Sequence, residues 1–127
     1  MAKRTKAKFI VVNLTNDATN DIISKITNKT KIITTAHVTN VTGRTIDVKE
    51  IGKHKQNAFH IVDGAQAAPH TKIDVQDIDS DFYIFSGHKM MAPTGVGVMH
   101  GKLEVLNKLK PFEYGGSMVD KVELDNT

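Results

Sequence analysis

Short apolar runs, of which those at residues 8–14 and 31–38 are rich in β-branched residues, alternate with helical patterns along this chain. The runs predict strands at residues 8–14, 31–38, 58–62, 81–85 and 96–99. The helical patterns predict helices from an Asn20 cap through Ile26, over 47–55 with Val48 and Ile51 inward, and over 102–109. This alternation predicts an α/β fold, with a mostly parallel sheet and helices on both faces.

Length and composition indicate a single globular domain over residues 1–127. Hydrophobic residues make up 39% of the 127 positions and charged residues 24%. No apolar run approaches the roughly 20 residues of a membrane helix, so we expect no membrane segment and a cytoplasmic location. The chain contains no cysteine, which excludes disulfides and any persulfide carried by the chain itself.

The net charge of +3 comes partly from basic residues near the start of the chain. Residues 1–7 are predicted to form a basic, flexible tail. Nucleic-acid binding is not expected, because aromatic residues do not interleave with these charges. The alternative is that this basic segment binds an acidic partner. His54, His60 and His100 lack ligand spacing, so no metal site is expected.

Polar side chains follow three of the predicted strands. Asn40 follows the strand at 31–38, and Asp63 and Gln66 follow the strand at 58–62. After the strand at 81–85 come Ser86, His88 and Lys89. Because ligands of open α/β sheets bind beyond the carboxyl ends of the strands, these residues are the candidate site.

These residue types suit a carbonyl cofactor that carries a phosphate and a pyridine ring. A partly desolvated Lys89 amine could form a Schiff base, and Ser86 and His88 could donate hydrogen bonds to a phosphate. Asp63 could pair with a protonated ring nitrogen, and Gln66 could reach a ring hydroxyl. Spacing alone favours the alternative of a surface lysine, a turn aspartate and a core histidine. His37 is interpreted as a packed structural histidine.

Six blocks together resemble one protein family. They are residues 36–43 (AHVTNVTG), 62–70 (VDGAQAAPH), 73–77 (IDVQD), 81–89 (DFYIFSGHK), 93–97 (PTGVG) and 115–118 (GGSM). In order and spacing they resemble class V, pyridoxal-phosphate (PLP) dependent cysteine desulfurases of the iron–sulfur cluster assembly group. The blocks cover nearly the whole chain and correspond to the central part of the family's large domain, which has the PLP-dependent aminotransferase (type I) fold.

The resemblance implies a role for each candidate residue. Lys89 resembles the catalytic lysine that holds PLP covalently and later moves a proton. Asp63 is similar to the aspartate on the pyridine nitrogen, and Gln66 to the glutamine near the 3-hydroxyl. Ser86 and His88 resemble phosphate ligands, and Asn40 the residue that contacts the substrate carboxylate.

The implied activity is removal of sulfur from L-cysteine to give L-alanine, by a homodimer that passes sulfur to an acceptor protein. The family's persulfide-forming cysteine and substrate-clamping arginine have no counterpart in this chain. We therefore expect a family fragment or truncated product with doubtful activity on its own. The alternatives are a selenocysteine lyase or other class V aminotransferase-like enzyme, a non-catalytic remnant, or a PLP-binding interaction module.

Overall fold

The computed structural model describes residues 2–113, 115, 116 and 118. Part of the GGSM block, Ser117, lies outside the described residues. The strands are β1 (Ile32–Ala36), β2 (Phe59–Asp63), β3 (Phe82–Ser86) and β4 (Gly97–Gly101). The helices are α1 (Ala2–Thr5), α2 (Ala18–Ile23), α3 (Val48–His54), α4 (Val75–Ile78), the 3₁₀ helix η1 (Gly87–Met90) and α5 (Leu103–Leu106).

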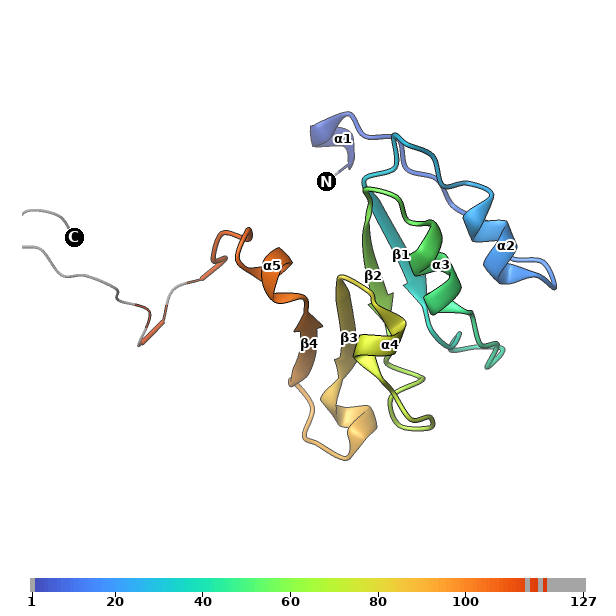
Figure 1. Cartoon of the computed structure of the whole chain (residues 1–127). Coiled ribbons are helices and arrows are strands. Elements are labelled where there is room, and N and C mark those ends of the chain that lie inside the picture. Colours follow the sequence, from blue (N-terminus) through green and yellow to red (C-terminus); the bar gives the residue numbers. More distant parts are fainter. Residues whose placement is uncertain (1, 114, 117, 119–127) are drawn as a thin grey trace, which may run out of the picture.

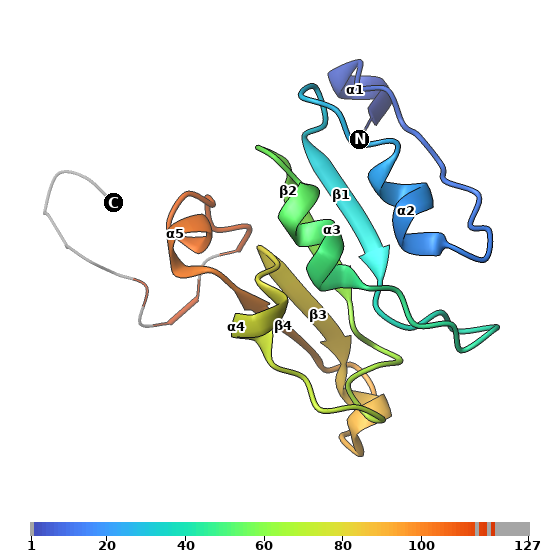
Figure 2. The same ribbon diagram turned by 45° about the vertical axis from the view of Figure 1, so that its right-hand side comes forward.

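The four strands form one sheet in the order β1-β2-β3-β4. β1, β2 and β3 run parallel, with Ala36 beside Asp63 and Asp63 beside Ile84. Figure 2 shows the arrows of β1 and β3 pointing the same way. β4 runs antiparallel to β3 (Figure 1). The predicted α/β fold with a mostly parallel sheet is confirmed.

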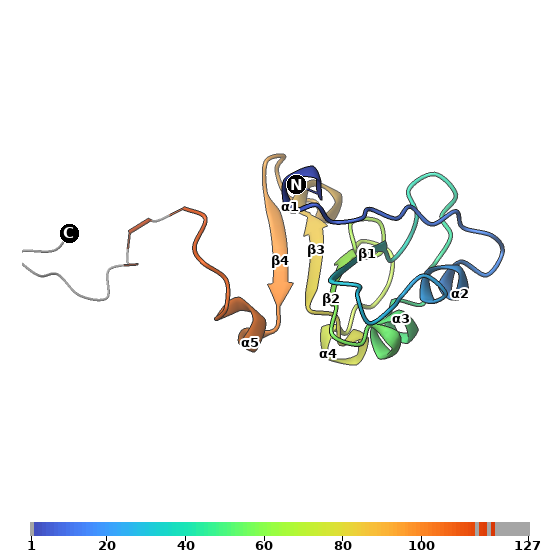
Figure 3. The same ribbon diagram turned by 90° about the horizontal axis from the view of Figure 1, so that it is seen from above.

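One face of the sheet carries the hydrophobic core. Because side chains alternate along a strand, Ile33, Val62 and Tyr83 point to the same face, and all three are buried. α2, α3 and α4 lie on this side of the sheet (Figures 1 and 3). The predicted inward residues of α3, Val48 and Ile51, are buried against these strands. The three-residue spacing of Val48 and Ile51 in the sequence therefore predicted α3 correctly.

A buried polar network is embedded in the same face. The Nζ of Lys55 lies 2.6 Å from Oδ2 of Asp81, and the His60 backbone N–H donates to the same oxygen over 2.8 Å. Oγ1 of Thr35 lies 2.9 Å from Nε2 of the fully buried His60. Burial alone would raise the Asp81 pKa, but the hydrogen bonds from Lys55 and His60 outweigh it and lower the pKa. The network ties the start of β2 to β3.

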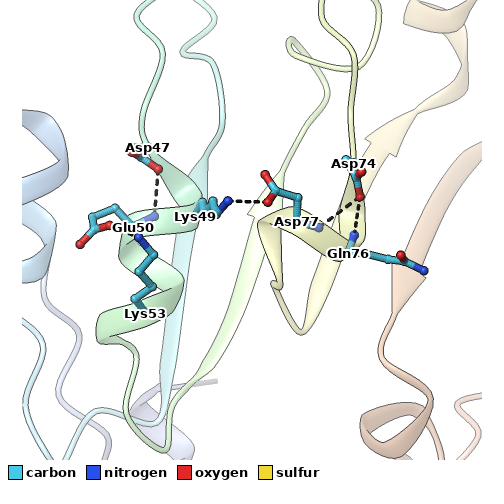
Figure 4. A network of polar contacts seen from close by, with 7 residues as sticks. All are labelled: Asp47, Lys49, Glu50, Lys53, Asp74, Gln76 and Asp77. Carbon is cyan, nitrogen blue, oxygen red and sulfur yellow. Dashed lines mark hydrogen bonds and ion pairs between the residues drawn. The ribbon is translucent and has the colours of Figure 1, made fainter.

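Aspartates cap the three helices on the core face. Asp17 caps α2 through a bond from the Asn20 N–H, so the predicted cap at Asn20 is wrong. Asp47 accepts from the Glu50 N–H at the start of α3. Asp74 accepts from two N–H groups of α4, and Lys49 of α3 pairs with Asp77 of α4 (Figure 4). Caps satisfy N–H groups that have no partner within a helix.

Two predicted elements differ from the structure. The strand expected at residues 8–14 is absent, because a strand needs a hydrogen-bonded neighbour and this segment has none. The helix expected over 102–109 is shorter: α5 ends at Leu106 and continues as turns to Leu109. α4 was not predicted, since four residues show no periodicity. α1 lies within residues 1–7, and the flexibility of that segment stays a prediction.

The predicted helices on both faces are not seen in the described residues: α2, α3 and α4 cover one face, and the opposite face of the sheet is largely uncovered. Ile32 is 62% exposed, Phe59 44% and Ile84 37%. α5 reaches this face only near β4, where Leu106 lies against Gly101 and next to the buried Phe82. An apolar surface of this kind indicates a place where something else binds.

Candidate functional site

The predicted site residues gather where the three parallel strands end. Asp63 is the last residue of β2, and Ser86 the last of β3. Asn40 follows β1 by a short turn, and Gln66 lies three residues after Asp63. Parallel strands deliver their carboxyl ends to one edge of a sheet, so residues far apart in sequence meet there.

A groove of about 450 Å³ opens on the uncovered face at this edge. Its lining is formed by Thr34, Ile61, Asp63, Ala65, Ile84, Phe85, Ser86 and Gly97. Most of that lining is apolar, and the Asp63 carboxylate and the Ser86 hydroxyl supply the polar groups nearest the strand ends. A mostly apolar groove with a few polar groups is typical of a site for a flat organic ligand. Asn40, Gln66, His88 and Lys89 lie outside this lining.

Asn40 and Gln66 are joined directly. Nε2 of Gln66 donates a hydrogen bond to Oδ1 of Asn40, which connects the turn after β1 to the turn after β2. With its oxygen engaged, Asn40 presents its NH₂ group as a donor. The bond brings together two residues that the sequence placed in different roles.

Asp63 begins a tight turn that rests on Tyr83. Its Oδ1 accepts from the Ala65 N–H over 2.9 Å, and the Gly64 N–H donates to the Ile84 carbonyl over 2.7 Å. A Cβ on Gly64 would lie 2.1 Å from the Tyr83 ring. Position 64 therefore requires glycine, because any side chain would overlap the ring.

His37 contacts the same tyrosine from the end of β1. Its Nδ1 lies 2.9 Å from the Tyr83 hydroxyl, and the two rings meet edge to face at 90°. Burial lowers the pKa of His37. Burial, followed by the nearby Asp63 charge, raises the pKa of Tyr83 to about 12. The sequence interpretation of His37 as a packed histidine missed this bond.

Ser86, His88 and Lys89 continue from β3 into η1. The Gly87 N–H donates to the Val96 carbonyl over 2.8 Å, which holds η1 against the start of β4. His88 is exposed, so the alternative of a core histidine is wrong. Lys89 is half-buried, and within the described part of the chain its Nζ forms no hydrogen bond or ion pair. Among the residues that the structure describes, no carboxylate pairs with this amine.

Sequence reasoning missed several residues of this region. Thr34, Ala65 and Phe85 line the groove, and Gly64 and Tyr83 shape the turn beside it. Gly64, which directly follows Asp63 at the end of β2, was a signal in the sequence that another group lies close to the backbone there. The other contacts join residues from different strands, so spacing along the chain could not show them.

A second hollow, of about 510 Å³, lies on the helix side of the sheet. It is lined in part by Thr19, His37, Asp47 and Lys72, and it contains none of the predicted site residues. Over residues 2–113, 115, 116 and 118, no three His, Asp or Glu side chains are grouped as metal ligands. None of the helices described has the length and apolar content that would cross a bilayer.

Several known proteins are similar to this chain in sequence and in fold. The Aminotransferase class-V family model matches residues 1–127. The chain is 48% identical to a probable cysteine desulfurase of Halalkalibacterium halodurans, covering 98% of this chain and 32% of the relative. It is 50% identical to a probable cysteine desulfurase of Staphylococcus epidermidis, covering 96% and 31%.

A solved structure is also similar to this chain. The cysteine desulfurase CsdA (S-sulfonic acid) from Escherichia coli superposes with a TM-score of 0.87 at 38% identity, over 98% of this chain and 32% of that chain. The chain thus spans about a third of the length of the relatives that it matches. The match of a family model to all 127 residues is decisive: this chain belongs to the class V aminotransferase family.

Proposed function

We propose that this chain supplies the PLP-binding strand ends of a cysteine desulfurase. The observation that carries the proposal is the groove on the uncovered face, where the Asp63 carboxylate and the Ser86 hydroxyl stand beside an apolar surface. The 48–50% identity to probable cysteine desulfurases supports the choice of reaction.

The groove's chemistry fits PLP. A flat ring can lie against Ala65 and Ile84, and a carboxylate at Asp63 suits a protonated ring nitrogen. Ser86 and His88 stand on either side of Gly87 at the start of η1, where a hydroxyl and an imidazole can donate to a phosphate. Within the described residues, the Lys89 Nζ forms no hydrogen bond or ion pair.

Each side chain then has a defined task. PLP, when bound, supplies an electron sink for a substrate carbanion. Asp63 would hold a proton on the ring nitrogen, and Lys89 Nζ would hold the cofactor and move a proton between substrate atoms. Gln66 lies close enough to Asn40 to orient its NH₂ toward a substrate carboxylate.

The wider assignments extend this proposal. The substrate is L-cysteine and the product L-alanine, with the sulfur passed to an acceptor protein for iron–sulfur cluster assembly. The working enzyme is a cytoplasmic homodimer. Because this chain has no cysteine, it cannot itself carry the sulfur, and we expect no appreciable sulfide release from it alone.

The cofactor assignment is tested by mixing the purified chain with PLP and recording its visible absorbance. We expect a yellow band from lysine-bound PLP that Lys89→Ala abolishes. The matched control is Lys31→Ala, which removes an exposed lysine at the opposite end of β1 and leaves the band intact. A folded wild-type chain without the band would contradict the proposal.

A further inference from the structure

His37 and Tyr83 form a bridge that none of the proposed cofactor or substrate contacts uses. His37 follows β1 and Tyr83 lies in β3, and their side chains are hydrogen-bonded over 2.9 Å. Their ring centroids are 6.0 Å apart. Because β2 lies between β1 and β3, the bond passes over the strand that ends at Asp63.

The two bridge residues also contact the Asp63 turn, one from each side. On the β1 side, the backbone N–H of His37 donates to the Asp63 carbonyl over 2.8 Å. On the β3 side, the Tyr83 ring fills the space where a Cβ of residue 64 would stand, and the Gly64 N–H donates to the carbonyl of the neighbouring Ile84 over 2.7 Å. Both the carbonyl and the N–H of the Asp63–Gly64 peptide are therefore hydrogen-bonded, and the bridge connects the residues on either side of it.

The bridge joins two neutral groups. Burial lowers the pKa of His37 and raises that of Tyr83 to about 12, so at neutral pH the imidazole is neutral and the phenol keeps its proton. The imidazole tautomer decides which of the two groups donates in the 2.9 Å hydrogen bond.

The bridge and the groove lie on opposite faces of the sheet. Tyr83 is 1% exposed and packs in the core, whereas Asp63, one register position away on β2, lines the groove. Neither ring lines the groove, so neither can touch a ligand there. Any effect on the ligand must pass through the backbone of Asp63 and Gly64.

We propose that His37 and Tyr83 are positioning residues that hold the Asp63 carboxylate in the orientation a protonated pyridine nitrogen requires. This inference rests on the proposed function for its ligand. It goes further by assigning a role to two residues outside the groove, and it predicts an effect specific to the ring nitrogen.

The specific effect is measured with two ligands. The first is PLP, and the second is an analogue with carbon in place of the ring nitrogen, which keeps the aldehyde and phosphate. Tyr83→Phe should weaken PLP binding about three- to tenfold, the size of one lost hydrogen bond, and leave binding of the analogue unchanged. Equal weakening for both ligands, or none for PLP, would overturn the inference.

A matched variant separates positioning from general loss of stability. Thr35→Val removes another buried hydroxyl–histidine bond on the same face, between Thr35 and His60, which lies three residues before Asp63 on β2. It should leave the affinity for both ligands unchanged. His37→Leu removes the imidazole from the bridge and should repeat the Tyr83→Phe result if that variant folds poorly.

A second readout needs no cofactor. The Ala65 N–H donates to Asp63 Oδ1, so its amide exchange reports the orientation of the carboxylate. Exchange at Ala65 and Gly64 should quicken in Tyr83→Phe and stay unchanged in Thr35→Val. Unchanged exchange in Tyr83→Phe would overturn the positioning role, even if the wild-type chain failed to bind PLP. That failure alone would instead contradict the proposed function.

Discussion

The two faces of the sheet differ in what covers them. On the helix side, Val62 and Ile51 are fully buried and even the polar His60 is enclosed. On the other side, Ile32 and Phe59 are exposed, and the groove containing Asp63 opens between β2 and β3. The helix face thus holds this chain together, whereas the open face is where a ligand can be held.

The largest expected effect contrasts the same residue type on the two faces. Ile51→Ala should lower the free energy of unfolding by about 4 kcal/mol, because it leaves a cavity in the core. Ile32→Ala, at a position 62% exposed, should change it by less than about 0.5 kcal/mol. Urea unfolding followed by circular dichroism measures both. Equal losses would remove the distinction between the faces.

The second largest effect is expected from acid, which should lower the free energy of unfolding through a buried histidine on the helix face. Burial, together with the Lys55 charge, lowers the pKa of His60 to about 4 from an ordinary value of 6.5. An unfolded chain therefore binds this proton near pH 6.5, while the folded chain does not. The free energy of unfolding should fall by about 3 kcal/mol as the pH drops from 6.5 to 4.

Two other groups also contribute to the pH dependence of the free energy of unfolding. His37, whose pKa is also lowered by burial, acts in the same direction. Asp81, with its lowered pKa, adds a loss that begins as the pH approaches 3.8 and grows below it. His60→Gln should flatten most of the change between pH 6.5 and 4. An unchanged pH profile in that variant would assign the effect elsewhere.

Gly64→Ala should act on both faces at once. Its Cβ would meet the Tyr83 ring at 2.1 Å, and such overpacking costs about 2 kcal/mol. The displaced turn should also weaken PLP binding. Gly52→Ala is the control: in α3 its nearest contact would be an ordinary 3.5 Å, so stability should stay equal or rise slightly. Thermal unfolding and a PLP titration compare the two variants.

The smallest effect is expected at the surface of the helix layer. Lys49 and Asp77 join α3 to α4, but their side chains are 47% and 60% exposed (Figure 4). Lys49→Ala should cost no more than about 0.5 kcal/mol, and added salt should erase the difference. A loss of several kcal/mol in the same urea experiment would mean that helix contacts outside the core carry the fold.

Sequence patterns predicted the elements whose signals are local. Val48 and Ile51 lie three residues apart and placed α3, a β-branched run placed β1, and apolar runs placed β2 and β3. The run at residues 8–14 has the same composition, yet it forms no strand, because strand formation depends on a neighbour that composition does not reveal.

The candidate site divides in the same way. Asp63 and Ser86 were found because each ends a strand, and both line the groove. The Asn40–Gln66 and His37–Tyr83 bonds join residues 26 and 46 positions apart. Such contacts are set by strand order and register, so the pattern along the chain could not predict them.

The central claim is that the open-face groove holds PLP with Lys89 as its attachment point. The most direct measurement is borohydride reduction of the chain mixed with PLP, followed by peptide mass spectrometry to locate the modified lysine. We predict modification concentrated at Lys89, and its loss from that peptide in Asp63→Ala. Modification spread over exposed lysines of a folded chain, or absent from Lys89, would contradict the claim.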